Sequence, residues 1–456
     1  MDRLEPIANA VVDVTTFGCK VNTYDSGLIQ QRLTQAGFDL NSAKQASSKR
    51  VHVLNSCAVT GEATAQALRQ ARRLKREDPT SVVVVTGCSA QVDTERFTTA
   101  EAVDLIVANS HKGDLPGLLQ DLLNGKSMDR VYKSNIFKKE DLEAGGGQEQ
   151  DHTRSFLKIQ DGCDSFCTFC VIPFARGKSR SIEPEVLVKK INQMHEEGIN
   201  EVVLTGVHIG DYQSEKGHDL SRLLQFILAG TSIPRLRLSS LEPIELNEHL
   251  MDLFQNPRLC PHFHMSIQSA STTVLAKMKR KYSAEQVTAA LEWIEKQVPE
   301  AYVGMDVIAG FPEESDQEFE DTYQRLTDSP WTRLHVFPYS SRPNTYAARA
   351  FTEVAGSVIH ERALRLRNLS HERLSQHAVS QIGKTKQVLW LKQPEGQGLS
   401  RDYWSVVLNT PATDNILSGE NSLRITGCER ELSRSGSLRL YGDLLDIPFD
   451  TLQKLV

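Results

Sequence analysis

The feature that most constrains this chain is a group of three cysteines within eight residues. Cys163, Cys167 and Cys170 stand in a C-x3-C-x2-C spacing, with Phe169 directly before the third cysteine. Thiolates are soft ligands, which select iron–sulfur clusters, zinc or copper(I) over hard cations. A cluster that only carries electrons uses four cysteines, and the sequence offers no fourth cysteine nearby. We therefore predict an iron–sulfur cluster in which one iron has no cysteine ligand. Such an iron can bind another group, which indicates a catalytic role rather than electron transfer alone.

A structural zinc site is the alternative interpretation of these cysteines. Such a site is normally closed by four Cys or His ligands. The nearest histidines are His152 and His195, and neither lies at the spacing of a zinc finger. The missing fourth ligand makes zinc the weaker hypothesis.

Length and cysteine usage limit the class of protein. The 456 residues suffice for about three domains of the usual ~150 residues. Eight cysteines are too few and too clustered for a secreted disulfide scaffold, which favours metal or catalytic use in a reducing compartment. The sequence shows neither an apolar signal segment at its start nor an uninterrupted apolar run of about 18 residues. We expect a cytoplasmic protein that does not span a membrane.

Residues 1–125 alternate between short β-branched runs and helical patterns. Strands are expected at 11–16, 51–55, 82–86 and 104–108, and helices at 24–36, 60–76 and 115–123. Strands that alternate with helices predict an α/β domain with a parallel sheet covered on both faces.

Three further cysteines, Cys19, Cys57 and Cys88, each follow one of these strands. Because the carboxyl ends of parallel strands line one crevice, the three thiols are expected to converge and to share a metal cluster. Gly18 and Gly87 directly precede two of them and suit turns with positive φ. The alternative is that each cysteine is an ordinary small buried residue. Their shared position at successive strand ends favours the cluster.

The rest of the chain predicts a linker and two more domains. The pattern is lost over 126–152, a linker with three consecutive glycines. Over 153–380, strands are expected at 155–160, 201–205, 235–239, 262–267, 302–308 and 333–337, with helices between them. This series predicts a partial (β/α)6 barrel whose chemistry sits at the carboxyl ends of its strands.

Short strands separated by turn-rich loops fill residues 381–456 and predict a small closed β-barrel, of the general kind that binds RNA. In this barrel, Tyr403 and Trp404 either stack on bases or pack in the core, and core packing is favoured for at least one of them. Cys260 and Cys428 have no partner at ligand spacing, and we interpret both as structural.

Charge gives only weak guidance on nucleic acid. The net charge is −6, whereas nucleic-acid-binding domains are usually basic. Basic residues nevertheless gather in three clusters, each of which is more simply explained as a solvated face. The clusters are Arg69, Arg72, Arg73, Lys75 and Arg76; Arg176, Lys178 and Arg180; and Lys277, Lys279, Arg280 and Lys281.

The motifs resemble those of a known family. The spacing C-x3-C-x-aromatic-C is the signature of radical S-adenosylmethionine enzymes, and the surrounding KIQDGC and FCTFCVIPFARG resemble the methylthiotransferase branch. The patterns TxGCxxNxxDS, NSCxVT and TGCxAQ resemble the N-terminal domain of that branch, and Asn22, Asp25, Asn55 and Gln91 stand at typical positions in them. The position of the C-terminal barrel matches the TRAM domain of the family.

The resemblance implies two 4Fe-4S clusters and S-adenosylmethionine as cofactors. One cluster is held by Cys163, Cys167 and Cys170, and its open iron is chelated by S-adenosylmethionine. The second, auxiliary cluster is held by Cys19, Cys57 and Cys88. The residues carried over for the S-adenosylmethionine site are Phe169, Gly206, Ser240, Glu242, Gln268 and Gly310.

Three points complicate the S-adenosylmethionine site. On sequence alone, Glu242 is equally well explained as a turn or helix-capping carboxylate. The chain also departs from the family's GFPGE and QSGS with GFPEE at 310–314 and QSA at 268–270. Loss of glycine at these two turns is expected to alter the approach of the backbone to the ligand.

The implied activity is insertion of a methylthio group into a hypermodified adenosine next to the tRNA anticodon. One S-adenosylmethionine methylates a sulfur on the auxiliary cluster, and a second yields the 5′-deoxyadenosyl radical that abstracts the base hydrogen. The segments GVHIGDY, SSLEP and HVFPYS most resemble the branch that acts on N6-threonylcarbamoyladenosine. The implied partners are the tRNA anticodon loop and a reducing electron donor of the flavodoxin or ferredoxin type.

Three alternatives stay open at this point. The first is the same reaction on N6-isopentenyladenosine of tRNA, and the second is methylthiolation of a ribosomal-protein aspartate. The third is a non-enzymatic RNA-binding protein with a structural metal.

Overall fold

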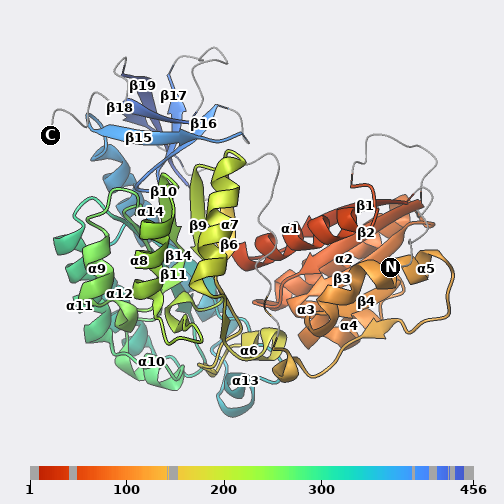
Figure 1. Cartoon of the computed structure of the whole chain (residues 1–456). Helices are drawn as coiled ribbons and strands as arrows, with labels where there is room; N and C mark the ends of the chain where they lie inside the picture. Colours follow the sequence, from red (N-terminus) through yellow and green to blue (C-terminus); the bar gives the residue numbers. More distant parts are fainter. Residues whose placement is uncertain are drawn as a thin grey trace.

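The computed structural model describes residues 10–40, 49–140, 142, 153–392, 396–409, 419–429, 431 and 437–445. Figure 1 shows an N-terminal α/β unit in red and orange beside a larger central unit in yellow, green and teal, with a small blue β-barrel on one end of the central unit. Among the described residues, no helix has the length and apolar character needed to cross a bilayer.

The N-terminal sheet is parallel throughout, with its strands in sequence order. They are β1 (Ala10–Thr16), β2 (Lys49–Ser56), β3 (Val82–Gly87), β4 (Leu105–Ala108) and β5 (Val131–Tyr132). Apolar cores cover both faces, one built with α1 (Lys20–Gln35) and α5 (Leu115–Leu123), the other with α2 (Gly61–Glu77) and α4 (Thr94–Thr98). The predicted parallel sheet is confirmed. The fifth strand lies within the stretch expected as linker, because two residues are too few to show a strand pattern.

The central unit consists of two parallel sheets rather than one continuous sheet. The first has the order β10-β9-β6 and the second β11-β12-β13-β14, so the chain passes from one sheet to the other at Ser239. The strands are β6 (Arg154–Lys158), β9 (Glu201–Thr205), β10 (Arg235–Leu238), β11 (Ser240–Leu241), β12 (His262–Gln268), β13 (Tyr302–Ala309) and β14 (Arg333–Pro338). All six expected strands are present, and they form the expected partial barrel.

Helices between these strands begin and pack as their sequences dictate. In α11 (Ala284–Gln297), Ser283 and Gln286 form a capping box that satisfies free backbone N–H groups at the helix start. Val287, Leu291 and Ile294 then repeat at helical spacing and are buried. The other long helices are α7 (Pro184–Glu196), α8 (Leu220–Gly230), α12 (Asp316–Asp328) and α14 (Gly356–Val379).

The C-terminal β-barrel is closed by five strands in the order β15-β16-β17-β19-β18. They are β15 (Thr385–Trp390), β16 (Gln397–Ser400), β17 (Ser405–Leu408), β18 (Glu420–Cys428) and β19 (Arg439–Leu444). The barrel is fixed to the amino ends of the central strands. Arg235 of β10 donates to the carbonyls of Leu399 and Ser400, each at 2.9 Å, and the Tyr403 ring lies 4.0 Å from the His262 ring. Tyr403 therefore packs against the central unit, and Trp404 is buried in the core.

Candidate active site

Three cysteines stand at the carboxyl end of the N-terminal sheet. Cys19 caps the start of α1, Cys57 directly follows β2, and Cys88 opens α3 (Cys88–Val92) after β3. At Gly18, where φ is +95°, an added Cβ would lie 2.5 Å from the Cβ of Cys57, so the turn that carries Cys19 touches Cys57. At Gly87, where φ is +92°, an added Cβ would clash with the carbonyl oxygen of Ser56. Both turns therefore require glycine.

The electrostatic surroundings of these thiols suit a bound cation. Burial raises the pKa of the Cys57 thiol to about 12, and the thiols of Cys88 and Cys19 add to the shift. The side-chain amide of Asn109 donates to Cys88 Sγ at 3.6 Å and to the Ala175 carbonyl at 2.9 Å. Thiols grouped in this way become thiolates when a metal supplies positive charge. The donor set thus fits an iron–sulfur cluster with one iron open.

Buried amides hold the turns around these cysteines. The Nδ2 of Asn22 donates to the carbonyls of Phe17 and Ser56 at 2.8 and 3.0 Å. The Nδ2 of Asn55 donates to the carbonyl of Asn22 at 2.9 Å, and Gln91 bonds the carbonyl of Ser134 at 3.1 Å. Asn22 and Asn55 therefore hold the turns, and Asn22 Oδ1 also accepts a hydrogen bond from the Cys88 thiol at 3.9 Å.

Asp25 lies at the centre of a buried charge network that joins the two units. Its carboxylate accepts hydrogen bonds from Lys112, Lys158 of β6 and Arg176 of α6 (Ile172–Arg176), at 2.8 to 2.9 Å. Asp161 accepts from the same Lys158 and Arg176 at 2.9 and 3.0 Å. Burial alone would raise the pKa of Asp25, but the three cations hold it well below its usual range. The network fixes the N-terminal unit against the strands before the second cysteine loop and against the helix after it.

That second loop runs from β7 (Gln160–Asp161) to α6 and carries Cys163, Cys167 and Cys170. The backbone N–H groups of Ser165 and Ile172 point at the sulfurs of Cys163 and Cys170, at 3.5 and 3.4 Å. Burial raises the pKa of Cys170 to about 12, with Cys167 and Cys163 adding to the shift. All three thiols line one cavity of about 260 Å³. This donor set also fits an iron–sulfur cluster with an open iron.

The cavity is bounded by both units. Val59 and Thr60, which closely follow Cys57, line it together with the second cysteine loop. Cys88 packs with Val171, which directly follows Cys170. The N-terminal cysteine group therefore lies beside the cavity wall, and the second group lines the cavity, at the carboxyl ends of strands, where a parallel α/β fold places its ligands.

Four of the six residues expected to bind S-adenosylmethionine line the cavity, namely Phe169, Ser240, Glu242 and Gln268. Gly206 and Gly310 are not among the lining residues. An added Cβ at Gly206 would lie 2.9 Å from the Gln160 carbonyl oxygen, and one at Gly310, where φ is +72°, would lie 2.5 Å from Ile359. The two glycines allow close packing of the turns.

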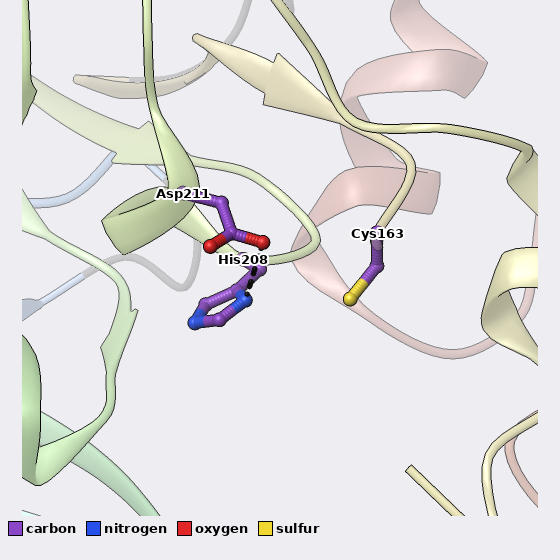
Figure 2. A group of neighbouring side chains, drawn as sticks. All are labelled: Cys163, His208 and Asp211. Atoms are coloured by element: carbon purple, nitrogen blue, oxygen red, sulfur yellow. Dashed lines mark ion pairs between the residues drawn. The ribbon is translucent and has the colours of Figure 1, made fainter. Parts of the chain in front are cut away.

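Sequence reasoning did not single out His208, which lies beside the second cysteine loop. Its Nδ1 is 2.9 Å from Asp211 Oδ2, and its Nε2 pairs with Glu245. Figure 2 shows the Cys163 sulfur directed toward the His208 ring, which is joined to Asp211 by an ion pair. Burial would lower the pKa of His208, but hydrogen bonds to Asp211, Cys163 and Glu245 raise it above its ordinary value. Its place directly after β9, in GVHIGDY, was the available signal.

Arg280 was also misjudged from sequence. It belongs to a basic cluster that the sequence explained as a solvated face. In the structure its side chain is only 9% exposed, pairs with Glu242 and lies over the Phe169 ring at 5.8 Å. Burial raises the pKa of Glu242, and Arg280 opposes that rise. Arg176, from another basic cluster, is likewise buried. Both arginines form ion pairs with carboxylates inside the fold rather than a solvated face.

The departures from the family's glycine motifs have different outcomes. Glu313, which stands where the family has glycine in GFPGE, adopts φ +58°, in the left-handed region. Ala270, in the other motif, is buried, and it is Gln268 that has a positive φ of 63°. The first turn therefore keeps the backbone form that favours glycine, at a cost on the order of 1 kcal/mol.

Comparisons with known proteins agree with this arrangement. Residues 157–326 match the radical SAM superfamily model, and residues 11–108 match a model described as uncharacterized protein family UPF0004. The threonylcarbamoyladenosine tRNA methylthiotransferase MtaB of Aquifex aeolicus is 34% identical over 383 residues, covering 83% of this chain and 92% of that protein. The tRNA-2-methylthio-N(6)-dimethylallyladenosine synthase of Maricaulis maris is 30% identical over 93% of this chain and 96% of that protein.

A solved structure adds support for the fold alone. The radical S-adenosylmethionine methyltransferase TsrM from Kitasatospora setae, 13% identical, superposes with a TM-score of 0.53 over 75% of each chain. The sequence relatives, together with the cysteine loop that lines the cavity and the second cysteine group beside it, lead to a single assignment. The chain belongs to the radical S-adenosylmethionine methylthiotransferases.

Proposed function

We propose that this chain is a tRNA methylthiotransferase that converts N6-threonylcarbamoyladenosine next to the anticodon into its 2-methylthio derivative. The observation that carries the proposal is that one group of three cysteines lines the cavity, while the other group lies beside its wall, through Val59 and Thr60 after Cys57 and through the packing of Cys88 on Val171. A radical source and a sulfur source must both reach the same base carbon, so a shared cavity is the geometry that this reaction needs.

The second cysteine loop is assigned the radical chemistry. Cys163, Cys167 and Cys170 hold a 4Fe-4S cluster, which supplies the electron that cleaves S-adenosylmethionine. Phe169, Ser240, Glu242 and Gln268 are placed to bind the cofactor, because they line the cavity beside these cysteines. Gly206 and Gly310 act on the same site through the turns that they allow.

The N-terminal crevice is assigned the sulfur chemistry. Cys19, Cys57 and Cys88 hold an auxiliary 4Fe-4S cluster with one open iron, which supplies the methylthio group. Arg176 contributes positive charge beside these thiols, since it opposes the pKa rise of Cys57. Asn22 fixes this arginine, accepting a hydrogen bond from Nη2 at 2.7 Å.

The RNA partner is a tRNA anticodon loop. A base in such a loop leaves its stack at small cost and can enter a cavity as a flipped nucleotide. We assign one role to each domain. Residues 1–125 carry sulfur insertion, 153–380 carry the radical chemistry, and the TRAM-like barrel of 381–456 binds RNA; residues 126–152 are the linker.

N6-isopentenyladenosine is the second candidate substrate. It is favoured by the relative from Maricaulis maris, which is named for the dimethylallyl base. Further relatives at 30 to 35% identity carry the threonylcarbamoyladenosine name, and their agreement gives that substrate the first place.

The test is mass spectrometry of tRNA nucleosides. The chain is expressed in a bacterial strain that makes both hypermodified adenosines but has lost its own tRNA methylthiotransferases. We expect the 2-methylthio form of threonylcarbamoyladenosine to appear, and Cys167→Ala to abolish it. Appearance of the methylthio form of isopentenyladenosine alone would refute the substrate assignment.

A further inference from the structure

Three phenylalanines form an exposed aromatic patch on the second cysteine loop. Phe166 lies between Cys163 and Cys167, Phe174 lies on α6, and Phe137 comes from the short helix η2 (Ile136–Lys138). The ring centroids of each pair are 5.9 to 6.2 Å apart. Phe166 and Phe174 nevertheless keep 40% and 41% of their surface exposed. Exposed aromatic clusters of this kind mark interaction surfaces.

The patch faces away from the substrate cavity. Ser165, Cys167 and Ile172 line that cavity, whereas their neighbours Phe166 and Phe174 do not. Phe174 and Phe137 instead line a separate groove of about 350 Å³. The three cysteines therefore line the substrate cavity, whereas Phe166, Phe174 and Phe137 lie outside its lining.

The backbone holds Phe166 in an unfavourable conformation. Its φ of +45° lies in the left-handed region, which costs a residue with a Cβ on the order of 1 kcal/mol. Such conformations persist mainly where function uses them. Here the strained residue sits between two cysteines and presents its ring at the surface.

Three exposed lysines stand near the patch in the sequence or along its groove. Lys138 follows Phe137, Lys178 lies just beyond α6, and Lys133 lines the same groove as Phe174; all three are exposed. Asp164 is an exposed carboxylate in the cysteine loop, and Asp93, which lines the groove, is paired with Arg342, so the three lysines leave a positive local balance. An apolar centre with a basic rim fits an acidic protein partner.

We propose that the patch of Phe137, Phe166 and Phe174 is the docking surface for the acidic electron-transfer protein that reduces the cluster held by the cysteine loop. The proposal rests on the proposed function, which requires one electron per cleavage of S-adenosylmethionine. The donor loses one electron and the cluster gains it, with no bond made to this chain. Electron tunnelling weakens steeply with distance, and this patch lies on the loop that carries the cluster ligands. Complexes of electron-transfer proteins use small interfaces, which a three-ring patch suits.

The test compares two reductants for the reconstituted holoenzyme. 5′-Deoxyadenosine formation is measured with a bacterial flavodoxin, reduced by NADPH and its reductase, and separately with dithionite. Phe174→Ala and Phe137→Ala are expected to raise the flavodoxin concentration for half-maximal rate on the order of tenfold, as truncation of an interface anchor does. The dithionite rate is expected to stay unchanged. Phe226→Ala, at an exposed phenylalanine of α8 on another surface, is the matched control.

The positive charge near the patch can be tested independently of the phenylalanines. The flavodoxin-driven rate is expected to fall with rising salt, and Lys178→Glu is expected to lower the rate at low salt and flatten that dependence. An equal loss with both reductants, or no loss with flavodoxin, would overturn the docking surface. Weakened tRNA binding with both reductant rates intact would assign the patch to RNA instead. If the unaltered enzyme forms no 5′-deoxyadenosine even with dithionite, the proposed function fails rather than the docking site.

Discussion

Arg176 joins the two cysteine-bearing regions through one side chain. It donates to Asn22 and Asp25 of the N-terminal unit and to Asp161 of the central unit, and it is buried. A buried ion network of this kind fixes geometry more than it adds net stability, yet loss of one partner leaves other charges uncompensated. The residue therefore controls how the two units meet.

Arg176→Met is expected to lower the free energy of unfolding by about 3–5 kcal/mol, because Asp25 and Asp161 lose a shared cation in a buried site. Thermal unfolding measures the effect. Lys178→Met, at an exposed position close by, is expected to change stability by less than about 0.5 kcal/mol. Equal effects of the two substitutions would show that the network does not hold the units together.

Glu313 offers a test at a strained backbone position. Glu313→Gly is expected to stabilise the chain by about 0.5–1 kcal/mol, since glycine adopts φ +58° without a Cβ penalty. Differential scanning calorimetry should show a higher unfolding midpoint. Gln317→Gly, in the regular helix α12, should lower the midpoint. A lower midpoint for Glu313→Gly would mean that its side chain contributes more than the strain costs.

At the scale of elements, the sequence predicted whatever depends on local pattern. The strand ends at Cys57 and Cys88 were predictable because β-branched runs stop there. The positive φ at Gly18 and Gly87 followed from glycine in tight turns. The split of the central strands into two sheets, and the two-residue strand β5, depend on hydrogen bonds to distant residues and left no local signal.

The same distinction between local patterns and long-range contacts applies to the candidate site. Cys163, Cys167 and Cys170 were proposed as ligands from their short spacing, and Cys19, Cys57 and Cys88 from their positions after successive strands; both signals are local. The burial of Arg176 and Arg280 was not predicted, since it depends on carboxylates far away in sequence, Asp25 and Glu242. His208 was missed because one histidine after a strand carries no distinctive spacing.

The contact between α1 and β6 makes a pH prediction through Asp25. Its folded-state pKa lies well below the ordinary 3.8, so its stabilising contribution is complete above that pH and is lost as the pH falls through the lower folded value. The thermal midpoint of the purified chain, before cluster reconstitution, should therefore fall steeply below about pH 4. Asp25→Asn should start from a lower midpoint and show a shallower acid slope. Parallel slopes would contradict a charged Asp25 in the folded state.

At the scale of the molecule, the C-terminal barrel and the cavity lie at opposite ends of the central strands. The barrel contacts the first residues of these strands, such as Arg235 and His262, and the cavity lies beyond their last residues. Strand β13 has eight residues, which span roughly 25 Å. Figure 1 shows the barrel at one end and α6, α10 (Thr272–Lys277) and α13 (Tyr346–Ala350) at the other. An RNA that reaches both ends must run along the molecule.

Tyr403 tests how the barrel is attached. Its ring packs on His262, and the Arg237 guanidinium lies 5.0 Å from the ring centre. Tyr403→Ala is expected to cost about 3–5 kcal/mol of stability in thermal unfolding, whereas Tyr403→Phe keeps the ring and should cost much less. Cleavage of S-adenosylmethionine below the unfolding range should be unchanged, because the cavity is at the far end. Loss of cleavage in a folded variant would contradict this separation.

The central claim is that two separate cysteine groups serve one cavity with different roles. Its most direct measurement is iron content together with 5′-deoxyadenosine formation in Cys57→Ala and Cys167→Ala after anaerobic reconstitution. Each variant is expected to lose about half of the iron. Cys57→Ala should still form 5′-deoxyadenosine but not the methylthio nucleoside, and Cys167→Ala should form neither. Unchanged iron in Cys57→Ala, or methylthio product from it, would contradict the account.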